Sequence, residues 1–216
     1  MTIRPRFTPG PCLAPAALGL AALGLSACSS TPPVHYHSLL APPKPAAAAA
    51  SAPPAPFLVE VLAVGIPAEL DQAQLVVHQS DGSLAILDGE RWAGPLADGI
   101  RTALSADISQ DLGTQDIAGL PRPAGKPLLR IKVQVRRLDA WPGQRVQMDA
   151  DWSIGVADEA GNARLSCRGR FEQAAPGAYV QLVQAQQAAL AALSARIAAD
   201  ARAWAGSHNA GCSAGA

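Results

Sequence analysis

The chain has 216 residues, of which 17 are basic and 17 acidic, so its formal net charge at neutral pH is zero. Proteins that bind nucleic acid usually carry a basic excess, and a neutral chain has no general attraction for an anionic membrane surface either. The composition therefore predicts no nucleic-acid partner, and the length suits one domain with a tether.

The first 27 residues have the order of a secretory signal peptide. Arg4 and Arg6 precede an apolar run from Ala16 to Leu25, and small residues then lead directly to Cys28. The run is far shorter than the roughly 20 residues that a membrane-spanning helix needs. We therefore predict that residues 1–27 are a signal peptide that is removed.

The triplet Leu25-Ser26-Ala27 before Cys28 is similar to the cleavage site of bacterial lipoproteins. The resemblance implies an S-linked diacylglycerol on the Cys28 thiol and an N-linked acyl chain on the new amino terminus, with no other cofactor. Cleavage leaves 15 basic and 17 acidic residues, so contact with the membrane would depend on acyl chains, which anchor stably when two or more are present. The alternative is an ordinary signal peptide that leaves Cys28 a free thiol.

Residues 28–56 are predicted to form a tether, because they are rich in proline and alanine and proline opposes regular helices and central strands. The 29 residues from Cys28 to Phe57 reach roughly 90 Å when fully extended. Residues 35–40 interrupt this composition with apolar and aromatic side chains. We interpret them as a short strand docked on the domain, with a plain linker as an equal alternative.

The folded domain is predicted to span residues 57–205. Its first segment, Phe57–Ile66, is an apolar run that predicts a strand buried on both faces. Next, Leu75–His78 and Leu84–Leu87 flank an Asp-Gly turn, which predicts a hairpin.

A helical period follows the hairpin. It predicts an amphipathic helix from about Ala93 to Leu112, ended by Gly113. The apolar stripe of this helix is formed by Trp92, Leu96, Ile100, Leu104 and Ile108.

Three segments that alternate apolar and polar residues then predict an antiparallel meander with one dry and one solvated face. They begin near Leu128, Val146 and Arg164, with turns at 141–144 and 158–162. The solvated face places basic residues beside Asp149 and Asp151, which predicts cross-strand ion pairs. An anion or lipid-headgroup site is the alternative use of these basic residues, which are Arg130, Lys132, Arg168 and Arg170.

An apolar stripe among alanine and glutamine residues predicts a second long helix, from about Ala178 to Ala205, that covers the sheet. Coiled-coil pairing of this helix is less favoured, since the pattern is short and lacks charged flanks. Residues 206–216 are predicted to be a flexible tail. The predicted fold class is α+β, a mainly antiparallel sheet with two long amphipathic helices packed on one face.

The sequence does not predict an enzyme or a metal site. It has no Gly-x-Ser-x-Gly nucleophile elbow, phosphate-binding glycine loop or His-Glu-x-x-His zinc helix. His35 and His37 could bind one metal ion together. However, isolated pairs of this kind are common in tethers and rarely bind a metal. Cys167 and Cys212 could form a disulfide in an oxidising compartment, with burial of Cys167 as a small apolar residue an equal alternative.

Two motifs are the most specific in the chain, Ile66-Pro67-x-x-Leu70-Asp71-x-x-Gln74 and Arg91-Trp92-Ala93-x-Pro95-Leu96. In their order they resemble the ABC-type transport auxiliary lipoproteins, the PqiC-like group, over about Tyr36 to Trp204. The resemblance implies a periplasm-facing lipoprotein without enzymatic activity that accompanies an MCE-type lipid transport system and supports envelope integrity. Its implied partner is an MCE-domain protein, and assembly into rings of identical chains stays open.

We expect the partner to dock on the loop from Pro67 to Gln74, including Leu70 and Asp71, and on the corner at Arg91 and Trp92. The reason is that Trp and Arg are enriched where binding energy concentrates. The alternative is that Trp92 covers the core beneath the first helix.

The residue after Cys28 bears on localisation. Position 29 is Ser rather than Asp, which favours the outer over the inner membrane by the sorting rule that the resemblance to enterobacterial lipoproteins implies. The main rival function is a periplasmic carrier or chaperone that itself holds lipid. Such a carrier would require an apolar cavity of several hundred cubic ångströms between sheet and helices.

Overall fold

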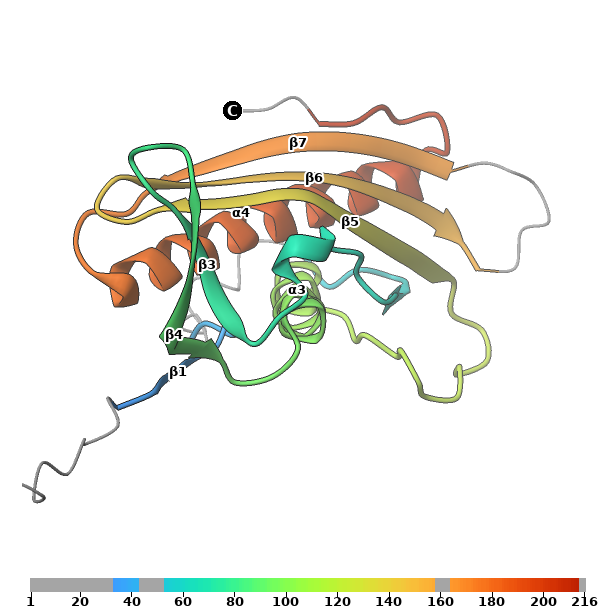
Figure 1. Cartoon of the computed structure of the whole chain (residues 1–216). Helices are drawn as coiled ribbons and strands as arrows, with labels where there is room; N and C mark the ends of the chain where they lie inside the picture. Colours follow the sequence, from blue (N-terminus) through green and yellow to red (C-terminus); the bar gives the residue numbers. More distant parts are fainter. Residues whose placement is uncertain (1–32, 43–52, 158–163, 214–216) are drawn as a thin grey trace, which may run out of the picture. The chain divides into compact units, whose positions relative to one another are not determined.

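The computed structural model describes residues 33–42, 53–157 and 164–213. Cys28, the predicted signal peptide and the predicted turn at 158–162 lie outside these residues. The described chain folds into two mixed sheets and two long helices (Figure 1). The predicted α+β class is therefore confirmed, with the strands divided between two sheets.

The larger sheet has the strand order β2-β5-β6-β7. Its long strands are β5 (Leu128–Trp141), β6 (Arg145–Val156) and β7 (Arg164–Ala174), and they pair antiparallel as the predicted meander does. The fourth strand, β2 (Leu58–Val61), joins β5 in parallel.

The predicted strand over 57–66 is shorter in the structure, because β2 ends at Val61. Val61 lies opposite Ile131, and Gly65 bridges again to Gln134 on the same strand β5. Gly65 lies four residues after Val61, whereas Gln134 lies only three residues after Ile131. The segment after β2 therefore contains one extra residue, which forms a bulge and interrupts the hydrogen-bond ladder.

The smaller sheet has the order β1-β4-β3. The hairpin of β3 (Gln74–His78) and β4 (Leu84–Trp92) is confirmed, and β4 continues five residues beyond its predicted end. The docked-strand interpretation of residues 35–40 also agrees with the structure, which has a strand β1 (His35–His37) paired in parallel with β4.

Helix α3 (Leu96–Leu112) begins three residues later than predicted. Pro95 is its N-cap, with φ −54° and a non-helical ψ of 130°, and proline disfavours helical backbone at the residue before it. Trp92 therefore ends β4 instead of starting the helix. Gly113 caps the helix at φ 60°, a left-handed conformation that glycine adopts without a steric penalty.

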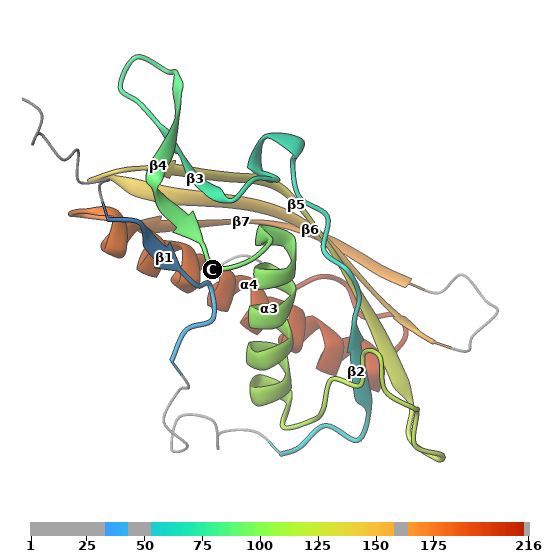
Figure 2. The ribbon, with the colours of Figure 1, turned by 60° about the horizontal axis from the view of Figure 1, so that its bottom comes forward.

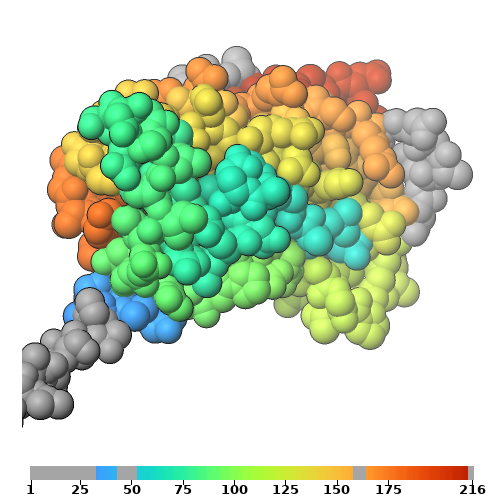
Figure 3. Space-filling view, in the orientation of Figure 1, coloured from blue at the N-terminus to red at the C-terminus, as the bar shows by residue number. Residues whose placement is uncertain are grey.

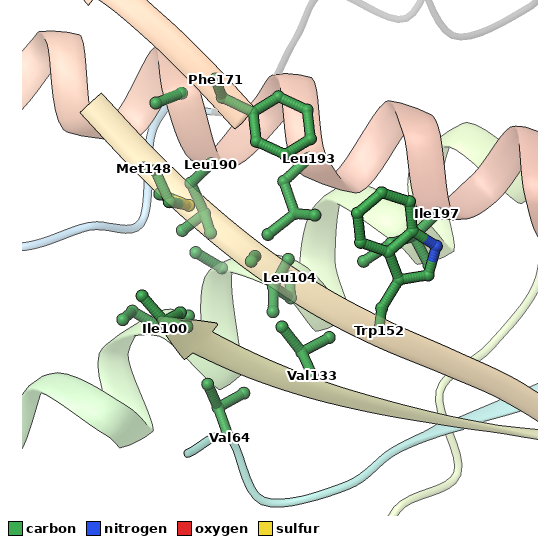
Figure 4. Packing of buried hydrophobic residues seen from close by; sticks show 14 of the residues in the cluster. Val64, Ile100, Leu104, Val133, Met148, Trp152, Phe171, Leu190, Leu193 and Ile197 are labelled. Carbon is green, nitrogen blue, oxygen red and sulfur yellow. The ribbon is translucent and has the colours of Figure 1, made fainter. Parts of the chain in front are cut away.

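Helix α4 (Tyr179–Gly206) lies along β6 and β7, and α3 crosses it beside β2 (Figures 1 and 2). Its predicted stripe is buried from Leu182 to Trp204. Figure 4 shows Trp152 and Phe171 of the sheet beside Leu193 and Ile197 of α4. Neither helix of the described chain has the length and apolar composition to cross a membrane.

Part of the segment predicted to be a flexible tail is attached to the domain. A disulfide joins Cys212 to Cys167 on β7, with Cα atoms 5.7 Å apart. The amide of Ser213 donates a hydrogen bond to Asp200 Oδ1 at 2.8 Å. These contacts attach the tail to the domain at Cys212 and Ser213, and the Cys167–Cys212 pair forms the disulfide that the sequence left as one of two alternatives.

We expect Leu104→Ala to destabilise the domain, because Leu104 is completely buried in the centre of α3. Removing its side chain should lower the free energy of unfolding by about 2–5 kcal/mol. Leu120→Ala is the matched control, since Leu120 is 65% exposed, and it should change stability by less than about 0.5 kcal/mol. Urea unfolding followed by circular dichroism measures both, and equal losses would contradict this description of the core.

Candidate docking surface and tether strand

Strand β1 attaches the end of the predicted tether to the domain. It pairs with the last residues of β4, with Tyr36 opposite Arg91. The amide of Ala93 donates to the carbonyl of His37 at 2.9 Å, and the side chain of Gln187 on α4 donates to the carbonyl of Ser38 at 2.8 Å. The buried Leu39 then enters the core. This short strand is therefore held by backbone, side-chain and apolar contacts together.

The carboxylate of Glu90 on β4 binds both histidines of β1. His35 Nδ1 donates to Oε1 at 3.0 Å, and His37 Nε2 donates to Oε2 at 2.5 Å. Partial burial of Glu90 opposes its ionisation, but the hydrogen bonds from His37 and His35 outweigh this effect and hold the pKa of the carboxyl below its ordinary value. The ionised carboxylate of Glu90 on β4 thus holds strand β1 in place through both histidines.

The two histidines were considered above as a metal pair, and in the structure they share this carboxylate instead. Within the described ranges, no group of three or more His, Cys, Asp or Glu side chains is arranged to hold a metal ion.

The structure brings together the two motifs expected to form the docking site. The amide of Trp92 donates to the carbonyl of Ala73 at 2.8 Å, and Arg91 lies opposite Gln74 across a bulge. However, Trp92 is only 7% exposed and Leu70 only 9%. Both belong to the core cluster, so their packing agrees with the alternative in which Trp92 covers the core.

Other side chains of this region, not Trp92 and Leu70, face the solvent. Asp71 is exposed, and Arg91 is half-buried with its Nε donating to the carbonyl of Asp88 at 3.1 Å. On the outer side of the hairpin, Leu84 is 48% and Ile86 55% exposed. Figure 3 shows the hairpin, in green, beside the strands of the larger sheet on one face of the domain.

A hollow of about 350 Å³ lies beside Leu84. Leu70, Val76 and Leu84 line it, together with the charged Glu69 and Arg137. We name the exposed Leu84 and Ile86 with this hollow the hairpin face. An apolar centre with a charged margin is the usual arrangement of a protein–protein contact surface.

The solvated face of the larger sheet carries the predicted cross-strand ion pairs. Arg168 Nε lies 2.6 Å and Arg136 Nε 2.7 Å from the carboxylate of Asp151. The hydrogen bond from Arg168 is the main reason that the pKa of Asp151 lies below its ordinary value. Arg170 pairs likewise with Asp149 at 2.9 Å. These charges thus satisfy one another across neighbouring strands.

Comparison with known proteins agrees with these motifs. A family model described as the ABC-type transport auxiliary lipoprotein component matches residues 37–198. The chain belongs to this family. No curated protein matches its sequence significantly.

Solved structures share the fold of this auxiliary lipoprotein. A crystal structure of an uncharacterized protein has a TM-score of 0.59 at 21% identity, covering 77% of this chain and 97% of its own. A Xanthomonas campestris protein assigned to the DUF330 family has a TM-score of 0.57 at 13% identity, covering 76% of this chain and 92% of its own. At these identities the likeness concerns the fold alone.

Two charged residues of this auxiliary lipoprotein were not singled out from the sequence. Glu90 sits among other polar residues of β4, where nothing in the sequence marks it as the partner of β1. Asp200 is 1% exposed and accepts a hydrogen bond from Trp152 Nε1 at 2.9 Å. Its spacing of three and four residues from Ile197 and Trp204 placed it on the apolar stripe of α4, which was a usable signal for a buried carboxylate.

We expect Glu90→Gln to loosen β1. Because the folded state lowers the pKa of Glu90, the carboxylate stabilises docking fully above its ordinary pKa of 4.5, and this stabilisation is lost as the pH falls through the lowered value. Hydrogen exchange of the Ala93 amide reports docking through its bond to His37. Glu90→Gln should accelerate this exchange about tenfold at pH 7, which corresponds to roughly 1.4 kcal/mol.

Asp88→Asn on the same strand is the control and should leave this exchange unchanged. In the unsubstituted protein, protection of the amide should fall once the pH is lowered below the ordinary pKa of Glu90, 4.5, after correction for the intrinsic pH dependence of exchange. Exchange that is the same in Glu90→Gln as in the original protein would show that the carboxylate does not hold the strand.

Proposed function

We propose that this chain is a non-enzymatic lipoprotein of the cell envelope that docks onto an ABC-type transport system. In this proposal Cys28 carries the acyl chains, the domain faces the periplasm, and the partner is an MCE-domain protein of a lipid transport system. Ser at position 29 favours the outer membrane. Support comes from the family, whose members are auxiliary lipoproteins of ABC-type transport, and from two features of the fold.

The first feature is the position of β1 close behind Cys28. His35 follows Cys28 by seven residues, whereas Phe57 follows it by 29. With β1 docked, the chain between anchor and domain extends at most roughly 20 Å, against roughly 90 Å for the whole tether. The docked strand would therefore keep the domain close to the membrane, and release of the strand would allow a longer reach.

The second feature is the hairpin face, which carries the apolar exposure that a docking component requires. Leu84 and Ile86 are two of the large apolar side chains that remain exposed in the described chain, and Leu84 also lines the hollow. Clustered apolar exposure of this kind typically marks an interaction surface. Asp71 and Arg91 lie near the same hairpin and would contribute polar contacts at its margin.

The rival function, a carrier with lipid inside the domain, receives less support. One continuous cluster of buried apolar side chains extends through α3, α4 and both sheets. Leu104, Leu193 and Val133 lie toward one another in the region where the carrier would need its cavity (Figure 4). The docking role accounts better for a filled interior.

We expect Ile86→Asp to abolish capture of the partner while leaving the domain folded, because the substitution places a charge in the centre of the hairpin face. Affinity purification of the full chain from solubilised envelopes, with mass spectrometry of the MCE-domain protein, should show at least a tenfold loss. The melting temperature should stay within a few degrees, since Ile86 is 55% exposed.

Val180→Asp is the matched control, because Val180 on α4 is also 55% exposed and lies outside the hairpin face. It should leave capture unchanged. Equal capture by the original chain and Ile86→Asp would overturn the hairpin face as the docking surface. Capture of no transport component by the original chain would overturn the proposed function.

A further inference from the structure

Exposed apolar side chains gather on the tether strand β1 and on the residues beside it. Tyr36 is 67%, Leu40 48% and Val34 40% exposed, and the three lie within seven consecutive residues. The other large apolar side chains exposed in the described chain are spread over the hairpin, the loop before β5 and the start of α4. In Figure 3 the segment that carries β1, in blue, lies open on the surface of the domain. We name Val34, Tyr36 and Leu40 the tether face.

The two sides of β1 have different surroundings. Successive side chains of a strand point to opposite faces. His35 and His37 point to the side on which Glu90 binds both of them, and the side chain of His37 is only 10% exposed. Tyr36 lies between the two histidines in the sequence and therefore points the other way, to the solvent. The domain thus uses one side of β1 and leaves the other side free for a contact.

The tether face lies close to the predicted anchor along the chain. Val34 follows Cys28 by six residues, which span at most roughly 20 Å when extended. A compact domain of this length is roughly 40 Å across. A bilayer that holds the acyl chains of Cys28 therefore lies no farther from Val34 than about half the width of the domain. In this one respect, the acylation of Cys28, the inference rests on the proposed function.

The composition of this part of the chain suits a lipid surface. No Asp or Glu occurs between Cys28 and Glu60, so no carboxylate of the tether opposes an approach to lipid phosphates. Tyrosine is enriched where a bilayer meets water, because its ring enters the apolar layer while its hydroxyl stays among the headgroups. The side chains of the tether face are themselves uncharged, so they suit the boundary between headgroups and acyl chains rather than an anionic headgroup.

We propose that the tether face lies in the headgroup region of the bilayer that holds Cys28, as a second membrane contact beside the acyl chains. A diacylglycerol with a further acyl chain already anchors the protein stably. The contact therefore sets the orientation of the domain and not its affinity for the membrane. Because β1 is paired with β4 and bonded to Gln187 of α4, the lipid contact of this short strand orients the whole domain.

This surface is separate from the hairpin face. It shares no residue with the hairpin face, and β1 pairs with Glu90 to Trp92 at the end of β4, beyond Leu84 and Ile86. Contact with lipid at β1 and docking of a partner at the hairpin can therefore succeed or fail independently.

Site-specific photo-crosslinking of the full acylated chain tests the proposal. The chain is reconstituted into vesicles of palmitoyl-oleoyl phosphatidylcholine with p-benzoylphenylalanine in place of Tyr36. Irradiation and intact-mass spectrometry then detect chains that are heavier by one phospholipid. The yield of this adduct should be at least fivefold higher than with the same probe in place of Leu120, which is equally exposed at 65% and lies outside the tether face.

His35 is the control for mere closeness to the anchor. Its side chain is 61% exposed, it precedes Tyr36 by one residue, and it points to the other side of β1. His37 keeps its hydrogen bond to Glu90 when the probe replaces His35. The adduct yield at position 35 should be at least threefold below that at position 36. Equal yields at the two positions would mean that lipid is met by proximity alone, and would overturn the proposal.

A charge in the tether face gives a second test. With the probe in place of Leu40, Tyr36→Asp should lower the adduct yield at least threefold, because a carboxylate is costly to remove from water. Tyr36→Phe keeps the ring and should change the yield less than twofold. Both variants should melt within a few degrees of the original chain, since Tyr36 is exposed. A yield that Tyr36→Asp leaves unchanged would contradict the proposal.

The mass of the chain before irradiation separates failure of this inference from failure of the proposed function. An unmodified amino terminus would overturn both. An acylated chain with equal phospholipid adducts at positions 36 and 120 would overturn the tether face alone. An adduct with a second copy of the chain in place of phospholipid would assign the face to contact between copies, and would also overturn it.

Discussion

The contact between α4 and strands β6 and β7 is the constraint on which the rest of the domain depends. Apolar side chains from Leu182 to Trp204 cover the dry face of the sheet. A hydrogen bond also joins α4 to the sheet, since the buried carboxylate of Asp200 accepts from Trp152 Nε1 on β6. The same carboxylate accepts from the amide of Ser213 in the tail. A buried carboxylate is tolerated only when such donors are present, so this contact also fixes how far α4 can slide along the sheet.

This seam determines which surfaces remain for interaction. Because α4 and α3 occupy one face of the larger sheet, the ion-paired face of β5–β7 and the β3–β4 hairpin stay accessible (Figures 1 and 2). The tether strand β1 joins the edge of the hairpin sheet and contacts α4 through Gln187. The tether strand β1 and the hairpin face thus meet on one strand, β4, which carries Glu90, Arg91 and Ile86.

Local patterns in the sequence were sufficient for the helices, the hairpin and the meander. Leu96 to Ile108 repeats every fourth residue, and β5 to β7 alternate strictly enough to fix both faces. Long-range parallel pairings were not predictable in this way, since Leu58 pairs 70 residues away with Leu128 and His35 pairs 55 residues away with Glu90. For the site, the sequence located both motifs, but it could not show that Trp92 and Leu70 are buried while Leu84 and Ile86 are exposed.

The central claim is that acyl chains on Cys28 hold an otherwise water-exposed docking domain at a membrane. Intact-mass spectrometry of the mature chain, extracted from the membranes of the cells that produce it, tests this claim most directly. The account predicts a chain that begins at Cys28 and is heavier than its sequence by a diacylglycerol and one further acyl group. A chain with an unmodified amino terminus would contradict it.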